Sequence, residues 1–269
     1  MNTPSSSAVV TGSTKGIGFA LARELVRRGH DVAVSGRTQD AVDEAVGKLT
    51  PEAAEGARVI GVPADVSDAA QVQALWDHAV AELGSVDLWI NNAGVAYTMR
   101  TIVETTPDEV ATMVSTNMVG TINGAQVAVR GMSAGRGGQV FNVLGGGSDG
   151  SVRPGMGVYS STKRGLDMFT RALVKEVEGT SVRVGQVRPG ILITDGWLRE
   201  AATNPESVQS QRRMVNILSD HVDDVAPYLV ERMLASTKNG DSIAWLTNGR
   251  MLKKFLRGAK DDKLARYGL

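Results

Sequence analysis

The sequence has 269 residues and no net charge, because 29 Asp and Glu balance 29 Lys and Arg; this argues against a dedicated nucleic-acid-binding protein. It contains no cysteine, which excludes disulfides, thiolate nucleophiles and cysteine-ligated metals. No apolar run approaches the ~18 residues of a membrane span, so we expect no membrane partner and a cytoplasmic location.

The chain opens on residues 1–7, which lack the basic and apolar regions of a signal peptide and predict a short flexible arm. After this arm, short apolar runs alternate with longer stretches of helical periodicity. The apolar runs predict strands at 8–11, 31–35, 58–63, 86–90, 139–143, 181–187 and 242–246. The periodic stretches predict helices at 16–28, 40–49, 69–83, 107–130, 158–177 and 221–234.

The alternation of strands and helices predicts the fold class. Parallel strands joined by helices form a sheet with helices on both faces. We therefore expect one α/β, doubly wound domain over residues 8–249, with a seven-stranded, mostly parallel sheet. Residues 194–219 interrupt the alternation and are predicted to cover a substrate, while residues 250–269 form a tail of undefined structure.

A glycine-rich turn joins the first predicted strand to the first helix. Gly12 permits a sharp turn, Gly16 lets the backbone approach a pyrophosphate, and Gly18 lets helix and strand pack closely. The N-terminus of the helix then faces the phosphate charge. The spacing is Gly-x3-Gly-x-Gly, and similar turns also occur without a ligand. The cofactor-binding residues predicted here are Gly12, Ser13, Thr14, Lys15, Gly16, Ile17 and Gly18.

The end of the second predicted strand indicates which dinucleotide binds. NAD-binding sites carry an acidic residue there for the ribose hydroxyls, whereas this chain has Arg37 and Thr38. Arg37 can bind a 2′-phosphate bidentately, and Lys15 adds a second cation. The sequence therefore favours NADP(H), unless Arg37 is only a solvated turn residue.

Tyr159 and Lys163 are spaced to lie on one face of a helix. A free tyrosine has a pKa of ~10, and a neighbouring ammonium favours the phenolate. We therefore expect Lys163 to lower the pKa of Tyr159. Tyr159 can then exchange the proton that accompanies hydride transfer at a carbonyl or carbinol.

These motifs, in this order, resemble the short-chain dehydrogenase/reductase family over residues 8–247. The resemblance implies a Rossmann-type sheet and hydride transfer with NAD(P). It also implies that Asp65 and Val66 contact adenine and that Asn91 and Gly94 line the cofactor. The other cofactor residues expected from the resemblance, besides Tyr159 and Lys163, are Ala93, Pro189, Gly190, Leu192 and Thr194.

Asn117 lies inside a predicted helix although asparagine is a poor helix former. The resemblance assigns it to a proton relay, in which it holds a water next to Lys163. The alternative is an asparagine on the helix surface.

The chain departs from the family pattern at the catalytic serine. Family members have a serine pair after the fifth strand, where this chain has Gly145 or Gly146. The segment instead resembles the chlorophyll b reductase branch of the family, and we assign the substrate hydrogen bond to Ser148. Ser151 is the other nearby hydroxyl, and the glycine run also fits a flexible loop in which Ser148 is only a turn residue.

The sequence thus predicts an NADP(H)-dependent oxidoreductase acting on a carbonyl or alcohol, with Tyr159, Lys163, Ser148 and Asn117 as catalytic residues and no metal. An apolar lid, with Trp197, Leu198, Met214 and Ile217, favours a bulky, partly apolar substrate. The alternatives are a non-catalytic NADP-binding sensor or scaffold and an epimerase or dehydratase. We expect a homodimer or homotetramer, paired through helices 107–130 and 158–177.

Overall fold

The computed structural model describes residues 6–259 and 262–265. Parts of the predicted arm (1–5) and tail (260–261 and 266–269) lie outside the described residues. The fold is built on one seven-stranded sheet in the order β3-β2-β1-β4-β5-β6-β7, and every strand pair is parallel. The strands are β1 Ser7–Val10, β2 Asp31–Gly36, β3 Val59–Pro63, β4 Leu88–Asn91, β5 Gly138–Val143, β6 Val182–Arg188 and β7 Ser242–Ala244.

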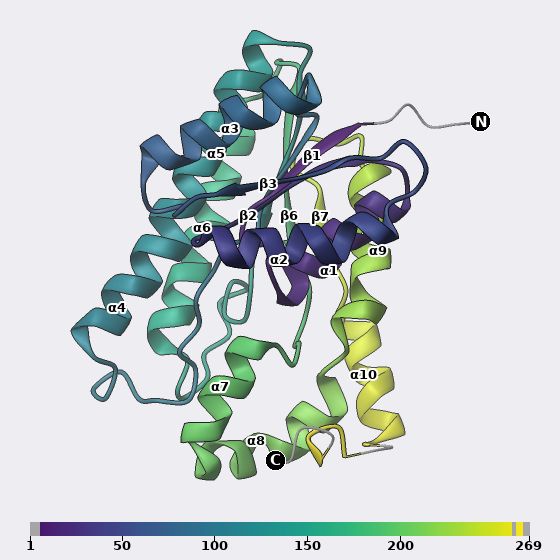
Figure 1. The fold of residues 1–269 in the computed structure, drawn as a ribbon. Helices are drawn as coiled ribbons and strands as arrows, with labels where there is room; N and C mark the ends of the chain where they lie inside the picture. Colours follow the sequence, from purple (N-terminus) through teal and green to yellow (C-terminus); the bar gives the residue numbers. More distant parts are fainter. Residues whose placement is uncertain (1–5, 260–261, 266–269) are drawn as a thin grey trace.

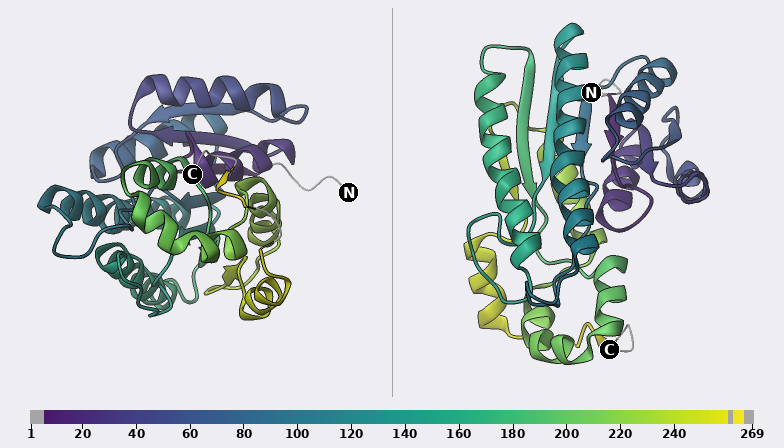
Figure 2. Two further views of the ribbon diagram at one scale, coloured as in Figure 1. Left: turned by 90° about the horizontal axis from the view of Figure 1, so that it is seen from below. Right: turned by 90° about the vertical axis from the view of Figure 1, so that its left-hand side faces the viewer.

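Helices cover both faces of this sheet (Figure 1). The helices on the two faces can also be followed in the two further views of Figure 2. The helices along the sheet are α1 Gly16–Arg27, α2 Gln39–Leu49, α3 Ala69–Leu83, α5 Gly120–Ala134, α6 Gly157–Glu176 and α9 Val222–Leu234. The remaining helices are α4 Pro107–Met113, α7 Asp195–Thr203, α8 Pro205–Leu218 and α10 Asn248–Arg257, with a 3-10 turn at Thr50–Glu52. The prediction of one doubly wound α/β domain is confirmed.

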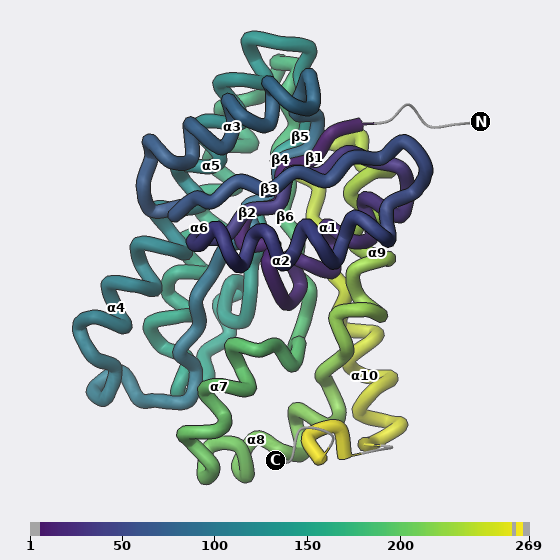
Figure 3. Tube along the Cα trace, viewed as in Figure 1, coloured from purple at the N-terminus to yellow at the C-terminus, as the bar shows by residue number. Residues whose placement is uncertain are grey.

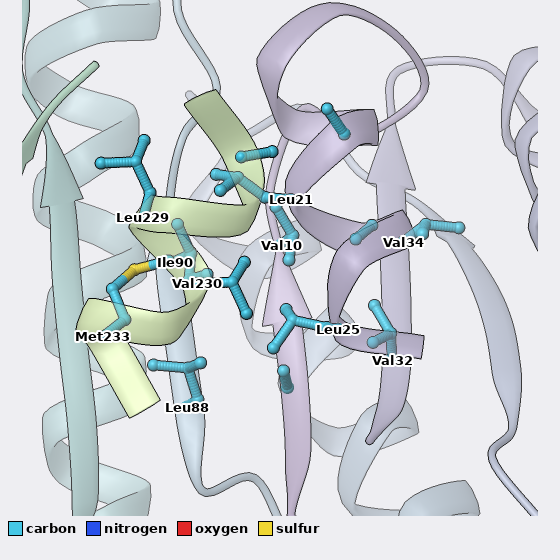
Figure 4. Close-up of a cluster of buried hydrophobic side chains, with 14 of the residues drawn as sticks. Val10, Leu21, Leu25, Val32, Val34, Leu88, Ile90, Leu229, Val230 and Met233 are labelled. Atoms are coloured by element: carbon cyan, nitrogen blue, oxygen red, sulfur yellow. The ribbon is translucent and has the colours of Figure 1, made fainter. Parts of the chain in front are cut away.

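The first core layer lies between the sheet and helices α1, α2 and α9. Figure 4 shows the part of this layer under α1 and α9. Val10, Val34 and Ile90 on the strands are buried against Leu25 of α1 and Leu229 of α9. Fully burying a side chain of this kind contributes ~1.5–3 kcal/mol. This packing holds α1 against β1 and thereby fixes the position of the turn that joins them.

The second core layer lies on the opposite face of the sheet, under α3 and α5. Trp89 of β4 is fully buried, and its ring centroid lies 6.0 Å from that of Trp76 on α3. Gly131 of α5 packs directly on the Trp76 ring, because a Cβ at that glycine would overlap it. The close packing fixes α5, and with it the helical segment that carries Asn117.

The long helix predicted over residues 107–130 is not a continuous α-helix. It is divided into α4, a π-helical segment at Val114–Val119, and α5, which extends to Ala134. π-helical turns inside α-helices are frequent at functional sites. The sequence did not predict the π-helical segment, because hydrophobic periodicity does not distinguish a single π turn from an α-helix.

The segment predicted to cover the substrate forms α7 and α8, at the lower end of the molecule in Figures 1 and 3. Both follow the carboxyl end of β6, the edge at which ligands bind in open parallel sheets. Ser7 belongs to β1 rather than to the predicted flexible arm. In the tail, whose structure the sequence left undefined, residues 250–257 belong to α10. Within the described residues, no helix is long and apolar enough to cross a membrane.

Candidate functional site

The glycine turn after β1 is shaped by contacts that exclude side chains. Gly12 adopts φ +62°, and a Cβ there would lie 2.7 Å from Ala93 Cα. Gly18 packs against the Asn92 side chain, where a Cβ would overlap the amide nitrogen. Gly16 also has a positive φ, but the space beside it is open apart from the Thr194 methyl at 3.9 Å. The turn is therefore closed toward the protein and open at Gly16, as a pyrophosphate cradle requires.

The N-terminus of α1 opens on this cradle. Lys15 precedes the helix without forming a side-chain cap, and the first turn contains no acidic residue. The uncapped N–H groups and the helix dipole favour an anion at this position. These residues fit the pyrophosphate of a dinucleotide.

Two predicted cofactor residues are engaged inside the protein instead. The Ser13 hydroxyl donates to Val10 O at 2.6 Å and accepts from Ser35 N–H at 2.9 Å. The Asn91 amide donates to Asn142 Oδ1 at 2.9 Å and its oxygen accepts from the Trp89 indole at 2.7 Å. Both side chains are therefore engaged within the protein, and so is the Ser13 N–H, which donates to Ser35 O at 2.8 Å.

Asn92 was not among the predicted site residues, yet it secures the glycine turn. Its side-chain nitrogen donates to Thr11 O at 2.9 Å and to Gly12 O at 3.1 Å. Its Oδ1 is buried and has no hydrogen-bond partner among the described residues. The motif Asn91-Asn92-Ala93-Gly94 contained the signal, but the sequence did not show which of the two asparagines faces the turn.

The carboxyl end of β2 lies directly beside the glycine turn. A Cβ at Gly36 would lie 2.5 Å from the Thr14 methyl, so the next residue, Arg37, lies close to the turn. Arg37, Thr38 and Lys15 are all exposed. Thr38 precedes α2 without capping it, so its hydroxyl is available to a ligand. The predicted pair of cations therefore lies on the same edge of the sheet.

Asp65 and Val66 follow β3, the neighbour of β2. The Asp65 carboxylate accepts from Ser67 N–H at 2.9 Å and from its hydroxyl at 2.6 Å, which forms a local turn. Val66 packs against Gly120 of α5, and its carbonyl accepts from Asn123 at 2.9 Å. The turn places both residues beside the end of β2, where the resemblance expects the adenine.

Tyr159 and Lys163 lie on one face of α6 as predicted. Lys163 is buried, and its Nζ donates to Val143 O at the end of β5 at 3.1 Å. The Nζ lies 5.8 Å from the centroid of the Tyr159 ring. The Tyr159 hydroxyl packs directly on Gly145, since a Cβ there would overlap the hydroxyl.

The expected lowering of the pKa of Tyr159 is not found in this environment. Burial raises the pKa of Tyr159 to about 12 and lowers the pKa of the Lys163 ammonium to about 8. Removal from water disfavours both charged forms, and the ammonium is too distant to compensate. Tyr159 is thus protonated at neutral pH, which is the form that can donate a proton.

Asn117 is fully buried in the π-helical segment, not on a helix surface. Its amide donates to Val95 O at 2.9 Å and to the Thr162 hydroxyl at 3.0 Å, and its oxygen accepts from Val95 N–H at 2.8 Å. A Cβ at Gly94 would lie 3.3 Å from this oxygen and 3.6 Å from Lys163 Nζ. Gly94 therefore lies directly beside both Asn117 and Lys163.

Ser148 is brought near α6, but its hydroxyl is engaged elsewhere. It is 1% exposed and accepts a hydrogen bond from Arg188 Nε at 3.2 Å. No hydrogen bond joins it to Tyr159 in the described structure. Ser151 is exposed, and its N–H donates to Asp149 Oδ1 at 3.0 Å.

The segment after β6 returns to the cradle and then forms the lid. Gly190 turns with φ +85°, and Leu192 pairs with Asp220, which draws the two ends of the lid segment together. The Thr194 hydroxyl accepts from Trp197 N–H at 3.4 Å and caps α7. Glu200 of α7 accepts from the N–H groups of Thr98 and Met99, which fastens the lid to the loop after β4.

The lid is apolar on its inner side. Trp197 packs against a buried cluster that spans α7, α8, the loop after β4 and the chain's end; its members are Met99, Ala201, Val208, Val215 and Leu264. Ile217 is buried, while Leu198 and Met214 are half-buried. No group of three or more His, Asp or Glu side chains that could hold a metal ion occurs within the described ranges.

The burial of Lys163 gives a prediction about stability. Lowering its pKa from 10.5 to about 8 corresponds to about 3 kcal/mol of disfavoured charge, and the bond to Val143 O recovers about 1 kcal/mol. Lys163→Met therefore raises the free energy of unfolding by about 1–3 kcal/mol at pH 7. Chemical denaturation at several pH values measures this gain.

The sign of its pH dependence follows from proton linkage. Between about pH 8 and 10.5 the unfolded wild-type chain binds a proton that the folded chain releases, so wild-type stability rises with pH. The advantage of Lys163→Met is complete below pH 8 and disappears toward pH 10.5. An advantage that is the same at pH 7 and pH 10.5 would show that packing, not the buried charge, causes it.

Known proteins are similar to this chain over most of its length. A family model described as short chain dehydrogenase matches residues 6–204. A probable chlorophyll(ide) b reductase of Arabidopsis thaliana is 37% identical over 261 residues, which cover 91% of this chain and 51% of that protein. A chlorophyll(ide) b reductase of Oryza sativa is 35% identical over 273 residues, covering 97% and 78%. Both are described as chloroplastic, so the cytoplasmic location stays a prediction.

Solved structures agree at the level of the fold. A short chain dehydrogenase from Burkholderia cenocepacia, in complex with NADP, superposes with a TM-score of 0.75 and 25% identity over 89% of this chain and 95% of its own. A putative short-chain alcohol dehydrogenase from Sinorhizobium meliloti gives 0.77 and 27%, over 89% and 94%. The chain spans about half the length of the Arabidopsis relative. The fold, the order of the motifs and these matches together show that the chain belongs to the short-chain dehydrogenase family of oxidoreductases.

Proposed function

We propose that this protein is an NADP(H)-dependent oxidoreductase that transfers a hydride between the nicotinamide and a carbonyl or alcohol substrate. One observation carries the proposal: Asn117 and Lys163 meet beside Gly94, and Lys163 Nζ lies 5.8 Å from the centroid of the Tyr159 ring, at the sheet edge that also holds the glycine turn. A phenol, an ammonium and a buried amide beside a dinucleotide cradle are the groups that proton transfer requires.

The preference for NADP(H) rests on charge at the end of β2. Arg37 and Lys15 are exposed there, and Arg37 follows the glycine that touches Thr14. Asp65 is the acidic residue predicted to contact the cofactor here, and its carboxylate accepts a hydrogen bond from the Ser67 hydroxyl. A 2′-phosphate therefore meets two cations, and the NADP complex of the Burkholderia relative supports the same choice.

In the direction of reduction, a bound nicotinamide would supply the hydride that the carbonyl carbon needs. The oxygen takes the Tyr159 proton as it becomes an alcohol, which balances the charge. Lys163 would hold the cofactor ribose, and its ammonium, 5.8 Å from the centroid of the Tyr159 ring, would attract the resulting phenolate. Asn117 holds a water next to Lys163, from which the proton on Tyr159 is replaced.

The lid favours a bulky, partly apolar substrate. Trp197, Leu198 and Met214 are half-buried and remain partly accessible on the segment above the sheet edge. The plant relatives are named for chlorophyll(ide) b, which is a large and mostly apolar molecule. A small polar acid would leave such side chains without contacts.

The test is NADPH oxidation measured with a panel of large apolar ketones and aldehydes. Turnover with at least one of them, and slower turnover with NADH, is the expected result. NADPH binding without turnover on any compound would favour a sensor or scaffold. Cofactor that stays bound through purification, with conversion of substrate but no net NADPH consumption, would favour an epimerase or dehydratase.

The predicted oligomer is also proposed here. Two apolar residues of the helix predicted at 158–177, Leu166 and Val177, are buried within the protein. Other apolar side chains face outward on α6 and the adjoining π-helical segment: Val114, Val119 and Met168 are 42%, 41% and 66% exposed. We expect a closed dimer or tetramer through this surface.

Light scattering at micromolar concentration measures this association, with an expected mass at least twice the chain's 28.4 kDa. Met168→Asp lowers the mass toward that of one chain. Leu256→Asp, which adds the same charge to an exposed leucine on α10, is the control and leaves it unchanged. A wild-type mass of 28.4 kDa would contradict the oligomer.

A further inference from the structure

Residues Gly145–Ser148 form a tight turn where the family places its catalytic serine. The Ser148 N–H donates to Gly145 O at 3.2 Å, and Gly147 at the third position has φ +83°. These are the features of a type II turn, which needs a positive φ at its third residue. Gly145 at the first position packs on the Tyr159 hydroxyl. The turn, rather than a side chain, therefore meets the reacting end of Tyr159.

The Ser148 hydroxyl belongs to a partly buried ionic network that includes Asp167 on α6. Arg188 donates to it through Nε at 3.2 Å and to Asp167 Oδ1 through Nη2 at 2.9 Å. Arg164 donates to Ser148 O at 3.0 Å. Gly147 packs against Ser160 on the same helix. Ser148 thus anchors the turn, and its hydroxyl is bonded to Arg188 rather than to Tyr159.

The peptide between Gly145 and Gly146 has a defined direction. Its carbonyl points into the turn, toward the Ser148 N–H. Because a trans peptide holds its N–H opposite its carbonyl, the Gly146 N–H points out of the turn. Gly146 is exposed, and its N–H makes no hydrogen bond to any part of the chain that the structure describes. The peptide nitrogen follows directly on the residue that touches the Tyr159 hydroxyl.

We propose that the Gly146 N–H donates a hydrogen bond to the substrate's carbonyl oxygen beside Tyr159, in place of a serine hydroxyl. Ser148, Arg188 and Asp167 are positioning residues that hold the turn. The inference rests on the proposed carbonyl reduction. A fixed backbone donor aimed at developing negative charge is worth ~10²–10³-fold in rate, which is comparable to a serine donor.

Gly146→Pro tests the donor, and Gly146→Ala is its matched control. Proline is favoured at the second position of a type II turn, so it removes the N–H without opposing the backbone. Both variants place a Cβ near the flexible end of Met156, at 2.8 Å from its Cε. We expect Gly146→Pro to lower kcat by at least ~100-fold and Gly146→Ala by less than ~5-fold, with NADPH affinity unchanged in both.

The activity of the wild-type enzyme distinguishes failure of the proposed function from failure of the proposed Gly146 donor. If it turns over no carbonyl compound, the proposed function fails before the donor is tested. If the wild type is active and Gly146→Pro equals Gly146→Ala, the amide is not the donor. Thermal midpoints and NADPH titration show whether the proline variant is folded.

Ser148→Ala provides a second measurement that does not depend on the proline variant folding. We expect its kcat to fall less than ~10-fold, because the hydroxyl only helps to hold the turn. Arg188→Lys, which keeps a charge for Asp167 but loses the fork, lowers kcat without changing NADPH affinity. Both changes remove the same hydrogen bond, from Arg188 to Ser148. The double variant should therefore lose less kcat than the product of the two single fold-losses. A loss of ~100-fold or more for Ser148→Ala alone would return the donor role to the serine hydroxyl and overturn the inference.

Discussion

Tyr159→Phe abolishes turnover while NADPH affinity stays nearly unchanged. The hydroxyl packs on Gly145 and makes no hydrogen bond within the described residues, so its loss leaves no buried partner unsatisfied. The aromatic ring, which packs the start of α6, is kept. Removing a positioned proton donor costs ~10²–10⁴-fold in rate. Stopped-flow oxidation of NADPH with the best substrate of the panel measures the effect.

The appropriate control is a tyrosine outside the proposed site. Tyr228 of α9 packs edge-on against Trp245, with ring centroids 5.4 Å apart. Tyr228→Phe keeps that contact, and its turnover should remain within ~2-fold of the wild type. If Tyr159→Phe kept more than a tenth of the wild-type rate, another group would be the acid.

Arg37→Asp reverses the cofactor preference. We expect the wild type to bind NADPH at least ~10-fold more tightly than NADH, a difference of ~1.4 kcal/mol. The aspartate repels the 2′-phosphate and accepts from the ribose hydroxyls of NADH, as acidic residues do at this position of NAD sites. The ratio of the two dissociation constants should change by ~100-fold or more. Calorimetric titration with both cofactors measures it.

Arg232→Asp makes the same change of charge at an exposed residue near the end of α9, and it should leave the ratio unchanged. Equal wild-type affinities for NADPH and NADH would contradict the cofactor assignment. A large change caused by Arg232→Asp would show that net charge, rather than contact with the 2′-phosphate, governs binding.

The sequence determined the elements and their order, because each strand and helix carries its own periodicity and end signals. Helix α3 has the predicted bounds, since Asp68 caps its start and Gly84 ends it in the left-handed conformation. The glycine turn was predictable for the same reason: its backbone needs are local. Lys163 and Tyr159 were placed on one face by helical spacing alone.

Contacts between distant segments were decided only by the tertiary structure. The sequence could not show that Asn92, rather than Asn91, holds Gly12, because strand pairing determines which amide faces the turn. Nor could it show that the π turn carries Asn117 into contact with Val95.

The pKa of Tyr159 and the partner of Ser148 depend on the same long-range packing. Spacing predicted an ammonium beside the phenol, but burial of α6 against β5 outweighs that charge and raises the pKa of Tyr159 to about 12. Ser148 was the nearest hydroxyl to the missing serine along the chain. Arg188 at the end of β6, which also donates to Asp167 on α6, reaches the Ser148 hydroxyl only after the strands are paired. Neighbouring residues determine the helices, strands and turns, whereas the burial of a side chain and its hydrogen-bond partners are set only when distant segments pack together.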